Sequence, residues 1–118
     1  MIYLDNAATT PVNPKALQAA WPWLTEEFGN PSSSHELGQR AAAALEAARD
    51  GVARFLGARA SEITFTSGGT ESDNLAILGM ALANPRGRHI VSAKTEHQAV
   101  LESIEFLERE HGFEITWL

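Results

Sequence analysis

The sequence predicts an α/β domain with a mainly parallel sheet and flanking helices. The first observation behind this prediction is the order strand, helix, strand, helix, strand between residues 62 and 118. The second is that apolar residues recur every three or four positions in the segments between the strands, which is typical of amphipathic helices. The third is that glycine, proline and capping residues mark the ends of these segments. With 44% hydrophobic and 20% charged residues, the 118-residue chain resembles an ordinary soluble domain.

The first thirty-four residues predict a short strand, a helix and a loop. Residues 1–14 are expected to form a short strand followed by a turn-rich stretch. Asn13 before Pro14 is a favourable helix start, and the helix is expected over about 14–24. Pro22 should kink or end this helix. The stretch FGNPSSS, residues 28–34, has the composition of a loop.

A long helix is predicted next. Ser33 and Glu36 have the spacing of a capping box, and Gly57 is a natural stop. One face of this helix carries an apolar stripe, made by Leu37, Ala41, Leu45, Ala48, Val52 and Phe55.

The second half alternates strands with helices. We expect strands at about 62–66, 89–93 and 114–118, and helices at about 70–83 and from Thr95-Glu96-His97-Gln98 to near Gly112. The first of these helices should end at Asn84-Pro85, and the second should bury Val100, Leu101, Ile104 and Leu107. Because a strand is the last element and nothing beyond it covers the sheet, the chain is expected to be the amino-terminal piece of a larger protein.

Composition excludes several classes of function. The net charge of -6 and the scattered basic residues argue against a nucleic-acid surface. The absence of cysteine excludes a disulfide framework, a thiolate metal site and a cysteine nucleophile within these residues, and we assign no metal ligands. Neither a signal-peptide pattern nor a long apolar run is present, so we expect a cytoplasmic protein without membrane contact.

The stretch TSGGTESDN, residues 66–74, places two glycines between a predicted strand and a predicted helix. In parallel sheets, ligands bind where strands end and helices begin. The first N–H groups of the helix lack partners and, with the helix dipole, favour a phosphate, and Thr70 adds a hydroxyl donor. The alternative is a tight turn in which Thr70 is a plain N-cap. The pattern lacks the lysine of a P-loop and the spacing of a dinucleotide fingerprint, so a nucleotide site is disfavoured.

His97 follows the next strand at a comparable position. A histidine there could exchange protons or stack on a planar ligand held by the preceding loop. The alternative is a surface histidine near a helix cap. The stretch LDNAATTPVNP, residues 4–14, is rich in small residues, but composition alone does not distinguish it from any turn.

Four stretches together carry a family resemblance: YLDNAATTP, FGNPSSSH, ITFTSGGTESDNLAI and TEHQAVL. They resemble the amino-terminal part of the NifS/IscS-like cysteine desulfurases, within the class V aminotransferase group of fold-type I pyridoxal phosphate (PLP) enzymes. The resemblance covers essentially the whole chain, in the family's order. It implies the amino-terminal part of a fold-type I large domain, with residues 1–14 near the active-site mouth and residues 15–118 as its incomplete first half.

The resemblance also implies site residues and a cofactor. Gly69 and Thr70 match the turn that holds the phosphate of PLP, and His97 matches the histidine that stacks on the cofactor ring and moves protons in catalysis. The implied reaction converts L-cysteine to L-alanine and leaves the sulfur as a persulfide on an enzyme cysteine, for iron–sulfur cluster assembly. The implied partners are a second copy in a homodimer and sulfur-acceptor or iron–sulfur scaffold proteins.

Some family residues have no counterpart in this chain. The cofactor lysine, the aspartate on the pyridine nitrogen and the persulfide cysteine lie far downstream in the family, and the only lysines in this sequence are Lys15 and Lys94. The 118-residue chain alone is therefore expected to be inactive. The alternatives are a sister activity, such as selenocysteine lyase or an aminotransferase, or a non-catalytic module if the gene ends at Leu118.

Overall fold

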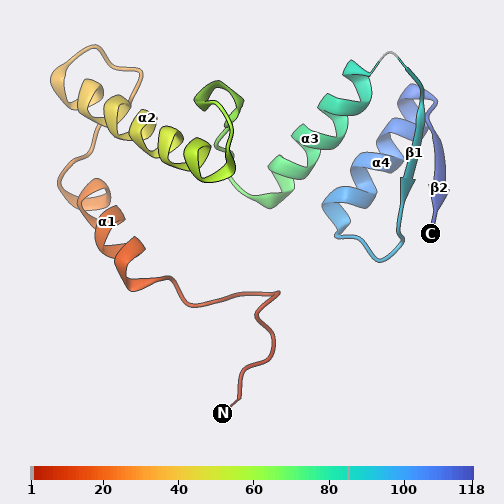
Figure 1. The fold of residues 1–118 in the computed structure, drawn as a ribbon, viewed down its shortest axis with the longest axis horizontal. Helices are drawn as coiled ribbons and strands as arrows, with labels where there is room; N and C mark the ends of the chain where they lie inside the picture. The colour runs from red at the N-terminus through yellow and green to blue at the C-terminus, as the bar shows by residue number, and fades with distance from the viewer. Residues whose placement is uncertain (1, 85) are drawn as a thin grey trace. The chain divides into compact units, whose positions relative to one another are not determined.

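The structure is a computed structural model that describes residues 2–84 and 86–118. The chain divides into two compact units, one reaching to Ile63 and the other running from Thr64 to Leu118. Within the described residues, the first unit holds two α-helices and a short 3₁₀ helix, and the second holds two α-helices and two strands (Figure 1).

The first unit begins with irregular backbone where we expected a strand. Residues 2–13 contain a turn, in which the Ala8 N–H donates to the Asp5 carbonyl at 3.1 Å. The Tyr3 hydroxyl lies within hydrogen-bond distance of the carbonyl oxygens of Asp5, at 2.8 Å, and Thr9, at 3.0 Å. The expected strand is absent from the described part of this segment because no neighbouring strand lies beside it, and a strand is stabilised by such pairing.

Helix α1, Pro14–Thr25, begins as predicted. Asn13 is the N-cap, and its side-chain oxygen accepts the Lys15 N–H at 2.9 Å. Pro22 does not end the helix, which was one of its two expected effects, because the helix continues to Thr25. The Pro22 carbonyl accepts the N–H groups of both Glu26 and Glu27, at 2.8 Å each, so the helix ends one turn after the proline.

Helix α2, Glu36–Leu56, ends as predicted but starts differently. Its C-cap is Gly57, whose φ of 67° lies in the left-handed region that favours glycine. Its N-cap is His35, whose Nδ1 accepts the Gly38 N–H at 3.4 Å, so the predicted capping box at Ser33 is wrong. The apolar stripe lies on this helix, but Phe55 is 89% exposed.

The loop of residues 28–34 is folded closely against the start of α2. A Cβ atom on Gly38 would lie 2.3 Å from the Ser33 carbonyl oxygen, and one on Gly29 would lie 2.3 Å from the Leu37 carbonyl oxygen. Both approaches are too short for any side chain, so the loop requires glycine at both positions. An ion pair between Arg40 and Glu27 also joins α2 to the segment before the loop.

The strand expected at residues 62–66 does not form. Residues Ala60–Glu62 form a short 3₁₀ helix, and the backbone from Ile63 to Thr66 is irregular although Ile63 has extended dihedral angles. The sheet in the described residues holds only β1, His89–Ser92, and β2, Glu114–Trp117. This segment therefore has the local geometry of a strand at Ile63, but the described residues offer it no strand to pair with.

The two strands confirm the parallel sheet. They pair in parallel, with Ile90 opposite Ile115 and Ser92 opposite Trp117. Helix α3, Gly69–Ala83, packs against α4, Gln98–His111, and α4 connects the two strands. The expected helix end at Asn84 is confirmed, while Pro85 lies outside the described residues.

The core of the second unit is centred on α4. Ile104, Leu107 and Phe113 are buried, with Leu107 fully so. The hydroxyl of Ser103 is also buried and donates to the Ala99 carbonyl at 2.7 Å. Gly112 ends the helix with a φ of 66°, as predicted from the sequence.

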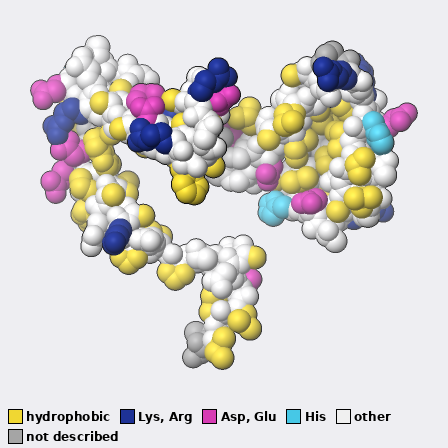
Figure 2. All heavy atoms as spheres, in the orientation of Figure 1, with side chains coloured by type: hydrophobic (Ala, Val, Ile, Leu, Met, Phe, Trp, Pro, Cys, Tyr) yellow, Lys and Arg dark blue, Asp and Glu magenta, His cyan; other side chains and the backbone are white. Residues whose placement is uncertain are grey.

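The same unit leaves an apolar groove open between α3 and the strands. Figure 2 shows hydrophobic side chains gathered on this unit, and the groove is lined by residues that include Ile77, Met80, Ile90 and Phe113. Met80 is 76% exposed. Across the described ranges 2–84 and 86–118, no helix has the length and apolar character needed to cross a bilayer.

Candidate functional site

The predicted site residues all lie in the second unit. Gly69 and Thr70 are the first two residues of α3, and His97 is the N-cap of α4. Helices α3 and α4 pack side by side, and Figure 1 shows that both begin at the end of the unit where β1 stops. The loops that precede these helices therefore occupy the end of the sheet at which α/β proteins bind ligands.

The start of α3 presents unpaired donors. Gly68 is the N-cap and provides no side chain for capping. In the described part of the chain, no acceptor is within hydrogen-bond reach of the N–H groups of Gly69, Thr70 and Glu71. The Thr70 hydroxyl likewise makes no hydrogen bond there, so Thr70 is not the N-cap of the alternative interpretation. Three N–H groups and a hydroxyl at the positive end of a 15-residue helix suit an anion.

Two sets of side-chain contacts hold the turn before α3. The Thr66 and Ser72 hydroxyls both donate to the Gly68 carbonyl at 3.1 Å and lie 2.6 Å from each other. The Glu71 carboxylate accepts both the hydroxyl and the N–H of Ser67, at 2.6 and 2.7 Å. The hydroxyl of Ser67, followed by its N–H, holds the pKa of Glu71 below its ordinary value. Glu71 therefore remains a carboxylate at neutral pH.

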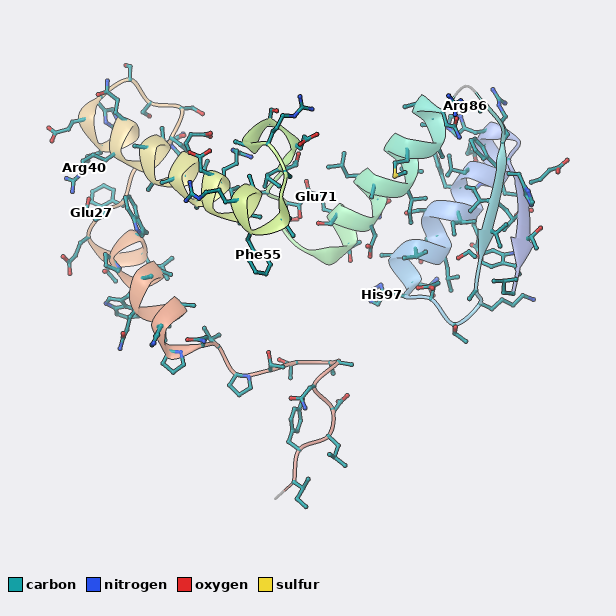
Figure 3. All side chains as sticks on the ribbon, viewed as in Figure 1. Glu27, Arg40, Phe55, Glu71, Arg86 and His97 are labelled. Carbon is teal, nitrogen blue, oxygen red and sulfur yellow. The ribbon has the colours of Figure 1, made fainter. Side chains whose placement is uncertain are left out.

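His97 is exposed and its ring caps α4. Its Nδ1 accepts the Ala99 N–H at 3.1 Å. A neutral imidazole whose Nδ1 accepts a hydrogen bond carries its proton on Nε2. Figure 3 shows His97 at the start of α4 and Glu71 at the start of α3. Thr95 and Gln98 have the spacing of a capping box, and we expected the helix to start at Thr95. That start is wrong, because α4 begins at Gln98 and the His97 ring caps it.

The family model for class V aminotransferases matches residues 2–118 of this chain. This chain belongs to the class V aminotransferase family. The resemblance found in its motifs is thereby confirmed. Enzymes of the family depend on PLP.

Relatives within the class V aminotransferase family are named as cysteine desulfurases. The chain is 52% identical to the cysteine desulfurase IscS of Dictyoglomus turgidum over 118 residues, covering 99% of this chain and 30% of that protein. It is 55% identical to the IscS of Anaeromyxobacter sp. strain Fw109-5 over 119 residues, covering 99% of the chain and 29% of that protein. The chain thus spans less than a third of the length of these relatives.

Solved structures agree with this assignment to the class V family. A NifS-like protein superposes with a TM-score of 0.86 at 39% identity, and the match covers 99% of this chain and 32% of that one. The apo structure of a cysteine desulfurase from Thermococcus onnurineus NA1 gives a TM-score of 0.81 at 32% identity, covering 99% and 30%. The α/β fold predicted from the sequence is therefore confirmed.

Sequence reasoning about this class V chain missed one part of the site. It placed Gly69, Thr70 and His97 at helix starts, where the structure has them, but it did not include the contact between Glu71 and Ser67. The signal was the spacing of four residues between a serine before the helix and a glutamate in its first turn. Among the described residues, no group of three or more histidine, cysteine, aspartate or glutamate side chains is placed to hold a metal ion.

Proposed function

We propose that the full-length protein containing this chain is a PLP-dependent cysteine desulfurase that converts L-cysteine to L-alanine and retains the sulfur as a persulfide for iron–sulfur cluster assembly. The observation that carries the proposal is the set of unpaired donors at the start of α3 in a chain about half identical to cysteine desulfurases. When bound, PLP supplies an electron sink for bond cleavage at the substrate.

The start of α3 is the proposed phosphate site. The N–H groups of Gly69 and Thr70, together with the Thr70 hydroxyl, would donate to phosphate oxygens. These donors fit an anion because they are exposed, adjacent and without partners among the described residues. A hydrogen bond to a charged group contributes about 1.5–3 kcal/mol, so Thr70 is expected to matter for affinity.

His97 is proposed to face the cofactor ring and to transfer protons through Nε2. Its Nδ1 is held by the Ala99 N–H, which fixes the ring orientation and leaves Nε2 as the atom available to a ligand. The persulfide cysteine must be supplied by residues beyond these 118, since this sequence contains no cysteine, and the cofactor lysine is assigned there as well.

The remaining features of the proposal concern the whole protein. The full-length enzyme is a cytoplasmic homodimer, takes L-cysteine as substrate and passes sulfur to an acceptor or iron–sulfur scaffold protein. Residues 1–14 lie near the active-site mouth and residues 15–118 form the first half of the PLP-binding domain. The cysteine desulfurase names of the relatives support L-cysteine as the substrate, and the other features are what the family resemblance implies.

Turnover of L-cysteine to alanine and sulfide by the full-length protein with PLP tests the proposal. His97→Asn and His97→Ala separate the two roles of the histidine, because asparagine is a good N-cap and alanine is not. Both variants should lose about 10²–10⁴-fold in kcat, the range for a positioned proton-transfer group. Only His97→Ala should also lose stability, by about 1 kcal/mol.

Three outcomes contradict parts of this proposal. Full activity of His97→Asn would show that His97 caps α4 and has no role in proton transfer. A protein that releases selenium from selenocysteine but not sulfur from cysteine would be a lyase of the sister class. Transamination without release of sulfur would make the protein an aminotransferase.

A further inference from the structure

The turn that precedes α3 is not fixed by packing. Cβ atoms placed on Gly68 and Gly69 would meet nothing within 4 Å, and both residues are exposed. Two adjacent glycines have more backbone freedom than any other pair, so ordering them costs more conformational entropy. Something other than van der Waals contact must therefore hold this turn in the conformation that presents its donors.

Polar side chains provide that restraint from both sides of the glycine pair. The Thr66 and Ser72 hydroxyls hold the Gly68 carbonyl, and the Glu71 carboxylate holds the N–H and hydroxyl of Ser67. None of these contacts uses the N–H of Gly69 or Thr70. The restraints therefore fix the turn and leave the proposed phosphate donors free.

The position of Glu71 is electrostatically unexpected for a residue beside a phosphate site. A carboxylate in the first turn of a helix is stabilised by the helix dipole, but it repels a bound dianion. The structure turns this carboxylate back toward Ser67, where it accepts two hydrogen bonds from the residue before the N-cap. Glu71 thus has two opposite effects on phosphate binding. It favours binding by ordering the turn, and it disfavours binding by repelling the negative charge.

We propose that Glu71 is a positioning residue for the phosphate of the cofactor, because it anchors Ser67 and so keeps the turn at Gly68 and Gly69 in its binding conformation. This inference rests on the proposed function. It predicts that Glu71 affects the binding of the phosphate group and does not affect the binding of the pyridine ring. Glutamine keeps an acceptor oxygen for Ser67, whereas alanine removes it, so the two substitutions separate anchoring from charge.

The test compares Glu71→Ala, Glu71→Gln and wild-type full-length protein. Glu105→Ala is the matched control, because it removes one negative charge from exposed surface elsewhere in the same unit. The first readout needs no ligand: order parameters of the Gly68 and Gly69 amides in protein labelled with ¹⁵N at glycine. The second is the Kd of PLP and of pyridoxal, which lacks the phosphate.

For Glu71→Ala we expect the two glycine order parameters to fall from about 0.85 toward 0.6, the values for rigid and flexible backbone. PLP affinity should fall about tenfold because the turn must then be ordered on binding, while pyridoxal affinity stays unchanged. Glu71→Gln and Glu105→Ala should remain close to wild type in both readouts.

Unchanged glycine order in Glu71→Ala, or tighter PLP binding by both Glu71 variants, overturns the inference, since Glu71 would then only repel the ligand. Failure of the proposed function has a different signature, because wild type itself would not prefer PLP to pyridoxal. In that case the order parameters alone still decide whether Glu71 anchors the turn.

Discussion

Glu71 and Thr70 are adjacent residues in the first turn of α3, and their side chains are used differently. The Thr70 hydroxyl has no partner among the described residues, whereas both donors of Ser67 are bound by Glu71. The Ser67 N–H is thus hydrogen-bonded within the protein, whereas the N–H groups of Gly69 and Thr70 are left for a ligand. This division was not visible in the sequence because it depends on the direction of the Glu71 side chain.

The contact between Glu71 and Ser67 should depend on pH. The two hydrogen bonds from Ser67 lower the folded-state pKa of Glu71, so the ionised form stabilises the fold. That contribution is fully present above the unfolded-state pKa of about 4.3 and is lost as pH falls through the lower folded-state value.

A carboxyl ¹³C titration followed by NMR measures this effect. Glu71 in wild type should titrate below about 4.3, and Ser67→Ala should bring its midpoint back toward that value because both its hydroxyl and the fixed geometry are lost. Glu62, whose pKa is lowered by hydrogen bonds from Arg59, is the internal control and should not change in Ser67→Ala. An unaltered Glu71 midpoint in Ser67→Ala would show that the serine does not stabilise the carboxylate.

At the scale of elements, the helix ends at glycine were predictable, and so was the start of α1 at Asn13, whereas the N-caps of α2 and α4 were not. Gly57 and Gly112 both end helices in the left-handed region, which glycine adopts more readily than other residues, so sequence alone identified them. At the starts of α2 and α4, several polar residues competed for the N-cap, and His35 and His97 took it through Nδ1. Histidine is not among the usual capping residues, so propensity pointed to Ser33 and Thr95 instead.

Strands were predictable only where a partner strand exists within the chain. The segments around Ile90 and Ile115 pair with each other and were placed correctly. The segment at residues 62–66 has strand-like composition, but its hydrogen bonds would require a neighbour that the described residues do not provide. A sequence pattern indicates the strand preference of one segment, whereas the hydrogen bonds of a sheet require two paired segments.

Helix α2 offers a matched pair of glycine substitutions. Gly38→Ala should destabilise the protein by about 1–3 kcal/mol, because the new Cβ would meet the Ser33 and Asn30 carbonyl oxygens at 2.3 and 2.8 Å. Gly51→Ala should stabilise it by about 0.5–1 kcal/mol, because nothing lies within 4 Å and alanine favours a helix. Free energies of unfolding from urea denaturation measure both. Equal effects of the two substitutions would contradict the close packing of the loop on α2.

At the scale of the molecule, the three candidate site residues all lie in the second unit. Gly69, Thr70 and His97 could be proposed as site residues from the sequence because several long motifs resembled one family at once, and the chain belongs to that family. The hydrogen bonds around these residues could not be predicted, since motif spacing does not give the direction of a side chain. The proposed chemistry also needs an activated lysine and a thiolate, and these 118 residues contain no cysteine.

The 118-residue chain by itself should therefore form no specific covalent link to PLP and release no sulfur from cysteine. Lys15 and Lys94 are its only lysines, and both are exposed. An exposed amine lacks the desolvation by which an apolar pocket activates a lysine nucleophile. Incubation with PLP, reduction with borohydride and peptide mapping should find no stoichiometric label. Stoichiometric labelling confined to Lys94 would show that the covalent chemistry is already present in this chain.

The most direct test of the central claim is a crystal structure of the full-length protein with PLP. We predict phosphate oxygens within about 2.7–3.2 Å of the Thr70 backbone nitrogen and of its hydroxyl, with the His97 ring over the pyridine ring. A phosphate held by other residues, with the N–H groups of Gly69 and Thr70 facing water, would contradict the assignment of this turn as the cofactor site.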